Sequence, residues 1–180
     1  MPNQVTAVHQ NLAHRFSKTT VPCIELIAGH GVAGDAHFGV TVKHRSRVAK
    51  DPTQPNLRQV HLLHEELFAT VASQGINVSP GDMGENLTTR GIDLLALGTG
   101  TRLKIGLNAI VEVTGLRNPC SEIEKFHTGL LAAVLVRSAD GALIRRAGVM
   151  GIVLEGGYVQ AKDTIEIIYA LCEYRALLPV

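Results

Sequence analysis

The chain has 180 residues, 46% of them hydrophobic and 18% charged, which suits one folded domain and excludes a disordered chain. Its formal net charge is only +1, so no overall basic field indicates nucleic acid or an acidic membrane surface as a partner. Any site for an anion must therefore be local.

Short strand-like segments separated by glycine turns dominate the chain. Eight runs alternate or concentrate apolar residues as strands do, at residues 4–10, 21–27, 58–63, 85–89, 101–106, 109–115, 148–157 and 163–169. Many short strands with few helices predict a mostly β fold, a β-barrel or curved sheet with a few peripheral helices. We expect one domain spanning residues 1–180.

Two segments have helical patterns. Residues 64–75 carry an apolar stripe at helical spacing and end in Gly75, a helix stop. Residues 121–136 open with Ser121 and place Glu124 three residues later, which is the spacing of a capping box. The sequence therefore predicts a helix starting at Ser121.

The three cysteines, Cys23, Cys120 and Cys172, lie far apart and show no CxxC spacing. A sparse, odd count argues against a disulfide framework and for a reducing compartment. The first ten residues lack the basic and apolar regions of a secretory signal, and the apolar run at 129–136 is far shorter than the roughly 20 residues of a membrane helix. We expect a cytoplasmic protein without membrane association, with Cys23 and Cys172 as buried thiols.

Cys120 stands at the corner between a predicted strand and a predicted helix, in the stretch VTGLRNPCSEIEKF. Arg117 and the helix start would lower the pKa of its thiol, whereas Glu122 and Glu124 would oppose this. Pro119 stiffens the approach to the sulfur. These features fit a nucleophile or a metal ligand, and they equally fit a small residue that fills a gap.

The eight histidines give no metal-binding pattern. His61 and His64 are three residues apart but His61 falls in a strand-like run, and neither HExxH nor paired CxxC occurs. A hydrolytic pair of cysteine and histidine would need a second signal that the sequence lacks. Zinc chemistry is therefore not indicated.

Two glycine-rich polar loops, residues 29–39 and 79–86, are candidates for ligand contact. Neither matches the phosphate loop GxxxxGK[ST] or the dinucleotide motif GxGxxG. Glycines allow a backbone to approach a ligand closely, but the same loops could simply be tight turns at the end of a barrel.

Residues 39–56 form a basic segment without apolar period, with Lys43, His44, Arg45, Arg47 and Lys50. It is either a solvated surface loop or a lid that brings positive charge to an anionic ligand.

The order of motifs resembles the MOSC family, the domains related to the C-terminal part of molybdenum cofactor sulfurases. The resemblance covers residues 20–168 and rests on GVAGDAHFG, SPGDMGENLTTR, LRNPCSE and GVMGIVLEGGYVQAKDTIEI. One departure is Lys162-Asp163, where the family often has a glycine-aspartate turn. The resemblance implies a mostly β fold built around a barrel.

The resemblance also implies that Cys120 carries sulfur as a persulfide or ligates molybdenum, as a soft thiolate can. It matches Arg117 to the arginine that precedes the family's cysteine, and it implies that loop residues shape the pocket: Gly34, Asp35, His37, Glu85 and Asn86. Charge and position alone add Arg45, Arg47 and Arg58 as candidates for the phosphate of the molybdenum cofactor, Mo-molybdopterin.

Three functions stay open. The protein could bind molybdenum cofactor and carry sulfur on Cys120, it could be a molybdenum-dependent reductase of N-hydroxylated compounds, or it could be a non-catalytic binding module. The family's association with pyridoxal phosphate belongs to a desulfurase domain for which the chain has no room, and no flavin or iron–sulfur motif is present. A sulfur donor or a redox partner protein would therefore be required.

Overall fold

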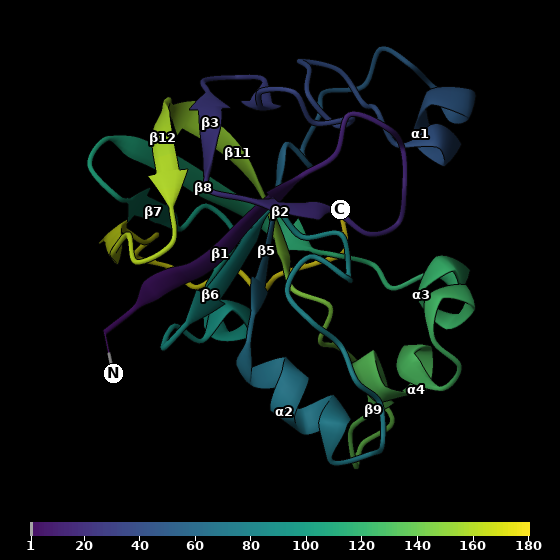
Figure 1. Ribbon diagram of the computed structural model, residues 1–180. Helices are drawn as coiled ribbons and strands as arrows, with labels where there is room; N and C mark the ends of the chain where they lie inside the picture. The colour runs from purple at the N-terminus through teal and green to yellow at the C-terminus, as the bar shows by residue number, and fades with distance from the viewer. Residues whose placement is uncertain (1) are drawn as a thin grey trace.

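The computed structural model describes residues 2–180, apart from the side chains of Arg45 and Ser46. Within these residues strands dominate and helices are short (Figure 1). The strands are β1 (Gln4–Gln10), β2 (Thr19–Val21), β3 (Cys23–Ile27), β4 (Gly31–Val32), β5 (Val60–His64), β6 (Leu87–Arg90), β7 (Arg102–Ile105), β8 (Ala109–Leu116), β9 (Leu135–Arg137), β10 (Leu143–Arg145), β11 (Val149–Glu155), β12 (Gly157–Gln160) and β13 (Ile165–Tyr169). The helices are α1 (Arg45–Lys50), α2 (Glu66–Ala72), α3 (Ser121–Phe126), α4 (Leu130–Val134) and the 3-10 turn η1 (Leu94–Ala96).

The main sheet has eight strands in the order β13-β7-β8-β11-β5-β6-β1-β2. Its neighbours are antiparallel except for β5 and β6, which run parallel. A three-stranded sheet, β12-β3-β4, packs beside it, and β9 pairs with β10 in a separate hairpin. All eight predicted strand runs contain a strand, and the prediction of a mostly β fold is confirmed.

The sheets do not close into a barrel, so that part of the prediction is wrong. Instead of a paired ladder, one isolated bridge between Gln4 and Thr164 connects β1 to the chain before β13. Backbone hydrogen bonds add to it, such as the one from the amide of Val5 to the carbonyl of Asp163, 2.8 Å long. Continuous pairing stops because β12 belongs to the other sheet, and the chain crosses between the sheets in a turn at Lys162. That lysine has φ 78°, the left-handed conformation that the family's glycine would adopt more easily.

The predicted helix from Ser121 to residue 136 is broken into α3, α4 and β9. The break lies at Gly129, whose φ is 86°. The side chain of Glu124 accepts hydrogen bonds from the amides of Gly129 (2.9 Å) and Leu131 (3.3 Å), and so caps α4 instead of closing a capping box at Ser121. The N-cap of α3 is Cys120.

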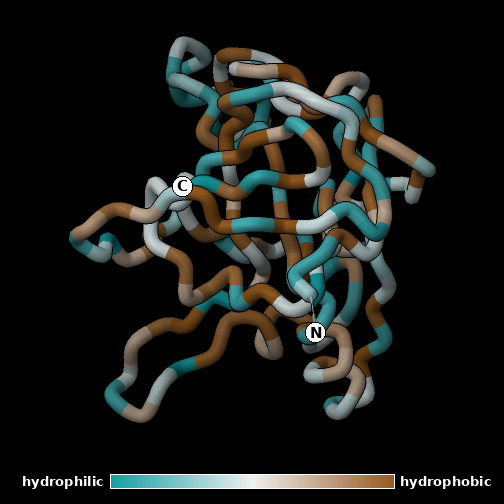
Figure 2. The backbone as a smooth tube through the Cα atoms, turned by 90° about the vertical axis from the view of Figure 1, so that its left-hand side faces the viewer, coloured by the Kyte–Doolittle hydropathy of each residue, from teal (hydrophilic) through white to brown (hydrophobic). Residues whose placement is uncertain are grey.

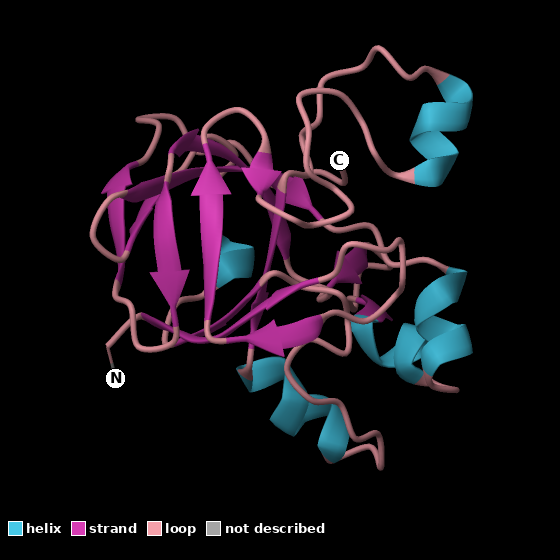
Figure 3. Ribbon diagram, turned by 45° about the horizontal axis from the view of Figure 1, so that its top comes forward, coloured by secondary structure: helices cyan, strands magenta, loops and turns pink. Residues whose placement is uncertain are grey.

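Two hydrophobic clusters form the core. The larger one lies between the main sheet, the three-stranded sheet and η1, and the smaller one lies between the main sheet, α2, α3 and α4. Figure 2 shows hydrophobic and hydrophilic residues alternating along the strands, and Figure 3 shows the α-helices gathered on one side of them. The ends of β5, β8 and β11 on that side carry the candidate site.

Among the described residues, none of the helices combines the length and the apolar character needed to cross a membrane.

Candidate functional site

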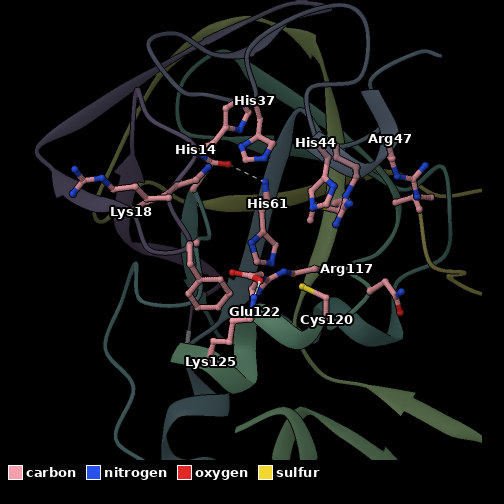
Figure 4. Close-up of a pocket in the computed structure, with 18 residues that line it drawn as sticks. His14, Lys18, His37, His44, Arg47, His61, Arg117, Cys120, Glu122 and Lys125 are labelled. Atoms are coloured by element: carbon pink, nitrogen blue, oxygen red, sulfur yellow. Dashed lines mark hydrogen bonds and ion pairs between the residues drawn. The ribbon is translucent and has the colours of Figure 1, made fainter. Parts of the chain in front are cut away.

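A cavity of about 710 Å³ lies between α1, α3 and the ends of the strands. Seven parts of the chain line it: the segment before β2, the segment from His37 to Arg58, strand β5, the turn before β6, the segment from Arg117 to Lys125, Met150 of β11, and Val180. Residues far apart in sequence therefore meet around one volume (Figure 4). Its size is typical of small-molecule and cofactor sites.

Cys120 is exposed and lines this cavity. Its backbone is extended, and Pro119 before it is buried, so the sulfur sits at a fixed corner ahead of α3. In Figure 4 the sulfur lies beside the side chain of Arg117. The other two cysteines lie outside the cavity, and the prediction that both are buried is wrong, since Cys23 is half-buried and Cys172 is exposed.

Arg117 lies next to the thiol, and its Nη1 is a buried donor without a hydrogen-bond partner in the described part of the chain. Its guanidinium lies over the ring of Phe16, 5.5 Å from the ring centre. Burial lowers the pKa of Arg117, and the charges of Cys120 and Glu85 oppose that lowering. A buried, unsatisfied cation of this kind is ready to donate to an anionic ligand.

Arg58 and Arg47 add further positive charge to the cavity wall. Burial lowers the pKa of Arg58 to about 10, helped by repulsion from Arg47 and Arg117 and opposed by Cys120. Burial lowers the pKa of His44 to about 4, again helped by repulsion from the neighbouring cations, Arg58 first. From the basic segment, His44 and Arg47 line the cavity, whereas the side chain of Arg45 lies outside the described residues.

Asp35 lies behind the cavity wall and bonds to several residues that line the cavity. Its carboxylate pairs with Lys18 at 2.8 Å, with both side chains almost fully buried. It also accepts hydrogen bonds from the amide of His37 (3.0 Å) and the side-chain amide of Asn86 (3.2 Å). Burial alone would raise the pKa of Asp35, but His37 and Lys18 together hold it well below its usual range. Gly34, with φ 75°, makes the turn that presents this carboxylate.

Asn86 lines the cavity and joins two strands. Its side chain donates to the carbonyl of His9 (3.2 Å) and accepts from the amide of His61 (3.1 Å). Glu85 is fully buried, accepts from the amide of Gly81 (2.6 Å) and from Thr88 (3.0 Å), and has its pKa raised by burial. Of the two, only Asn86 reaches the ligand volume, and Glu85 supports the turn.

His61 is a wall residue whose ring is neutral, because burial lowers its pKa well below the usual value. Its Nε2 lies 2.8 Å from the carbonyl oxygen of Ala147, and since a carbonyl only accepts, Nε2 carries the proton. The ring of His61, which the sequence offered as a possible metal ligand, is therefore hydrogen-bonded to the backbone. Among the described residues no group of three or more histidine, cysteine, aspartate or glutamate side chains is placed to hold a metal ion.

The structure thus brings Cys120, Arg117, Arg58, His37 and Asn86 to the cavity, and it places Gly34, Asp35 and Glu85 behind it. Sequence reasoning missed the segment before β2, including Phe16 and Lys18. Nothing in that segment signals a site, because Lys18 meets Asp35 only after folding.

The model of the MOSC domain family matches residues 33–166, which is more than half of the chain. The chain belongs to the MOSC domain family. This confirms the resemblance inferred from the motifs.

Relatives agree with this assignment. YuaD of Bacillus subtilis (strain 168), whose name connects it with metal-sulfur cluster biosynthesis, is 30% identical over 149 residues, with 76% of each chain covered. The crystal structure of the Bacillus subtilis YuaD protein superposes with a TM-score of 0.72 at 25% identity, over 92% of this chain and 94% of that one. YiiM of Escherichia coli shares the fold, with a TM-score of 0.65 at 19% identity over 96% of this chain and 73% of that one.

Proposed function

We propose that this MOSC protein binds the molybdenum cofactor in the basic cavity, with the phosphate of the cofactor on Arg58 and Arg117 and the thiol of Cys120 at the metal or at its sulfur. The observation that carries the proposal is the unpartnered, buried Nη1 of Arg117 beside an exposed thiol. A phosphate offers the charged acceptors that such a donor requires. When bound, the cofactor would supply two-electron redox chemistry or a site for sulfur exchange.

Two roles for Cys120 are compatible with this proposal. As a ligand, its thiolate is a soft donor suited to molybdenum. As a carrier, it would attack the outer sulfur of a donor persulfide, so that a new S–S bond forms on Cys120 and the donor leaves as a thiolate. The name of YuaD, which refers to metal-sulfur cluster biosynthesis, favours the second role.

Either role needs a partner protein, a sulfur donor in one case and an electron donor in the other. Either role also needs Cys120 to stay reduced, which suits the cytoplasm. A reductase acting on N-hydroxylated compounds would be one form of the first role.

The test is the pterin content of protein expressed in a host that makes the cofactor. We expect Arg58→Gln to weaken retention of the pterin by about 10- to 100-fold, the effect of losing a charged hydrogen bond of about 1.5–3 kcal/mol. Arg137→Gln is the matched control, because Arg137 is exposed on the β9–β10 hairpin, outside the cavity lining, and its side chain donates to the Gly141 carbonyl within that hairpin. Equal pterin content in Arg58→Gln and wild type would contradict the assignment of the cofactor phosphate to Arg58.

A further inference from the structure

The peptide group between Leu57 and Arg58 is held by two side chains. The carbonyl of Leu57 accepts a hydrogen bond from the hydroxyl of Thr114, 2.6 Å long. The amide of Arg58, which belongs to the same peptide group, donates to the side-chain oxygen of Asn56 at 3.1 Å. Both polar groups of this peptide therefore have side-chain partners, which fix the plane of the peptide next to Arg58.

Asn56 is itself fixed in place. Its side chain is buried, and its amide nitrogen donates to the carbonyls of His37 and Gly39, both at 2.9 Å. Its backbone amide donates to the carbonyl of Val40 at 2.8 Å. Since carbonyls only accept, the nitrogen of the side chain faces them and the oxygen faces the amide of Arg58.

Thr114 lies on β8, the strand that leads directly into Arg117. The same strand therefore holds Arg117 through the chain and Arg58 through the hydrogen bond to Leu57. Both arginines line the cavity together with Cys120, whereas Thr114 and Asn56 are not among its described lining residues. The two supports can thus act on a ligand only through the arginine that they hold.

The chain is also fixed on the other side of Arg58. The side chain of Gln59 is buried, donates to the carbonyl of Gly29 (2.8 Å) and accepts from the amide of Val153 (3.0 Å). An arginine side chain has many rotamers, and a backbone fixed on both sides limits the directions in which it can extend.

We propose that Thr114 and Asn56 are positioning residues, which clamp the peptide before Arg58 and so direct its guanidinium into the cavity that Cys120 lines. The clamp sets the place of Arg58 relative to Arg117, the two cations that the proposed function, on which this inference rests, assigns to the cofactor phosphate. Preorganised donors of this kind bind an anion without the cost of ordering them first.

The test measures the rates at which two reagents alkylate Cys120 in the full chain, expressed in a host that does not make the cofactor. Iodoacetate is an anion and iodoacetamide is neutral, so the ratio of their rates at one thiol reports local positive charge and cancels the thiolate fraction. Peptide mass spectrometry follows Cys120 separately from the exposed Cys172, which is the internal reference. We expect Arg58→Gln and Thr114→Val each to lower the ratio at Cys120 by at least about 2-fold. Thr114→Ser, which keeps the hydroxyl, should retain the wild-type ratio.

Thr6→Val is the matched control. Thr6 is also half-buried on a strand, and its hydroxyl donates to the backbone carbonyl of Thr88 (3.3 Å), outside the cavity lining. Valine suits a strand and has nearly the shape of threonine, so these variants should fold. The double variant Thr114→Val, Arg58→Gln should give the ratio of Arg58→Gln alone, because a residue that acts only through Arg58 adds nothing once Arg58 is gone.

Several outcomes would overturn the inference. An unchanged ratio in Arg58→Gln would show that its guanidinium does not serve the thiol, and an unchanged ratio in Thr114→Val would show that the clamp does not direct it. An equal loss in Thr6→Val, or a further loss in the double variant, would indicate a general structural effect. Wild-type protein that holds no pterin in a cofactor-making host would instead contradict the proposed function, while the alkylation ratios, measured without cofactor, would still test the clamp.

Discussion

At the scale of single residues, Asp35 organises the wall of the cavity without lining it. Its carboxylate forms an ion pair with Lys18, and both side chains are almost fully buried. Its oxygens also hold the backbone of His37 and Asn11 and the side chain of Asn86. We therefore assign this aspartate a structural role behind two residues that reach the ligand volume.

Asp35→Asn should destabilise the protein by about 3–5 kcal/mol, because it leaves the ammonium group of Lys18 buried without its counter-charge. Urea unfolding at neutral pH measures the loss. The double variant Lys18→Met, Asp35→Asn is the control and should recover part of it, since no charge then remains unpaired. A double variant as unstable as Asp35→Asn would contradict the ion-pair explanation.

The pH dependence of this loss follows from the pKa of Asp35, which folding lowers from its ordinary value of 3.8. A group whose pKa falls on folding stabilises the protein above its unfolded pKa and loses that contribution as the pH drops below it. The difference between wild type and Asp35→Asn should therefore be constant above about pH 5 and shrink below about pH 4.

Sequence motifs led to several residues that line the cavity and to Asp35 and Glu85 behind them, but not to Lys18 and Phe16. Cys120 and Arg117 share one short motif, and Arg58 stands out by its charge beside a strand. Lys18 and Phe16 carry no such signal, because each acquires its partner only when strands distant in sequence come together. Motif reading therefore found the cysteine and the arginine that line the cavity but missed part of its wall.

At the scale of elements, Gly148 allows β5, β8 and β11 to converge at the site. Its φ is 87°, and a Cβ there would overlap the carbonyl oxygen of Leu62 and lie 3.0 Å from Nε2 of His61. Its carbonyl accepts the amide of Arg117 at 3.0 Å. Close approach of these backbones places Arg117 and His61 on the same wall.

Gly148→Ala should destabilise the protein by more than Gly141→Ala, its matched control. Gly141 has φ 85° and open space around it, so that substitution costs only the backbone strain of about 1–2 kcal/mol. Overlap at Gly148 adds about 1–3 kcal/mol. Thermal unfolding of the two variants gives the comparison, and equal losses would show that the contact with Leu62 does not matter.

The elements also show where local patterns fail. The apolar period predicted one helix from Ser121 onward, but Gly129 adopts a left-handed conformation and Glu124 caps a second helix there. A glutamate three residues after a serine predicts a capping box if one helix continues from that serine. Here Glu124 instead accepts hydrogen bonds from the amides of Gly129 and Leu131, at the start of the second helix. The helix α1 was not predicted, because its segment lacks an apolar face.

At the scale of the whole molecule, a net charge of +1 conceals a strongly uneven distribution. Arginines from three distant segments gather in one cavity, while carboxylates such as Glu65 and Glu112 pair with Arg90 and Arg102 elsewhere. The near-neutral composition predicted that any anion site would have to be local. It could not locate the site, because that depends on how the sheets are joined.

The molybdenum and pterin content per chain, in wild type and Cys120→Ser expressed in a host that makes the cofactor, tests the central claim most directly. We expect near-stoichiometric pterin in wild type, and a folded Cys120→Ser variant that has lost molybdenum or, by intact mass, a reductant-sensitive extra sulfur. Cys120 is exposed and is the N-cap of α3, a position that serine suits, so the substitution should not lower the unfolding midpoint. Wild-type protein with no pterin, no molybdenum and no extra sulfur on Cys120 would contradict the account.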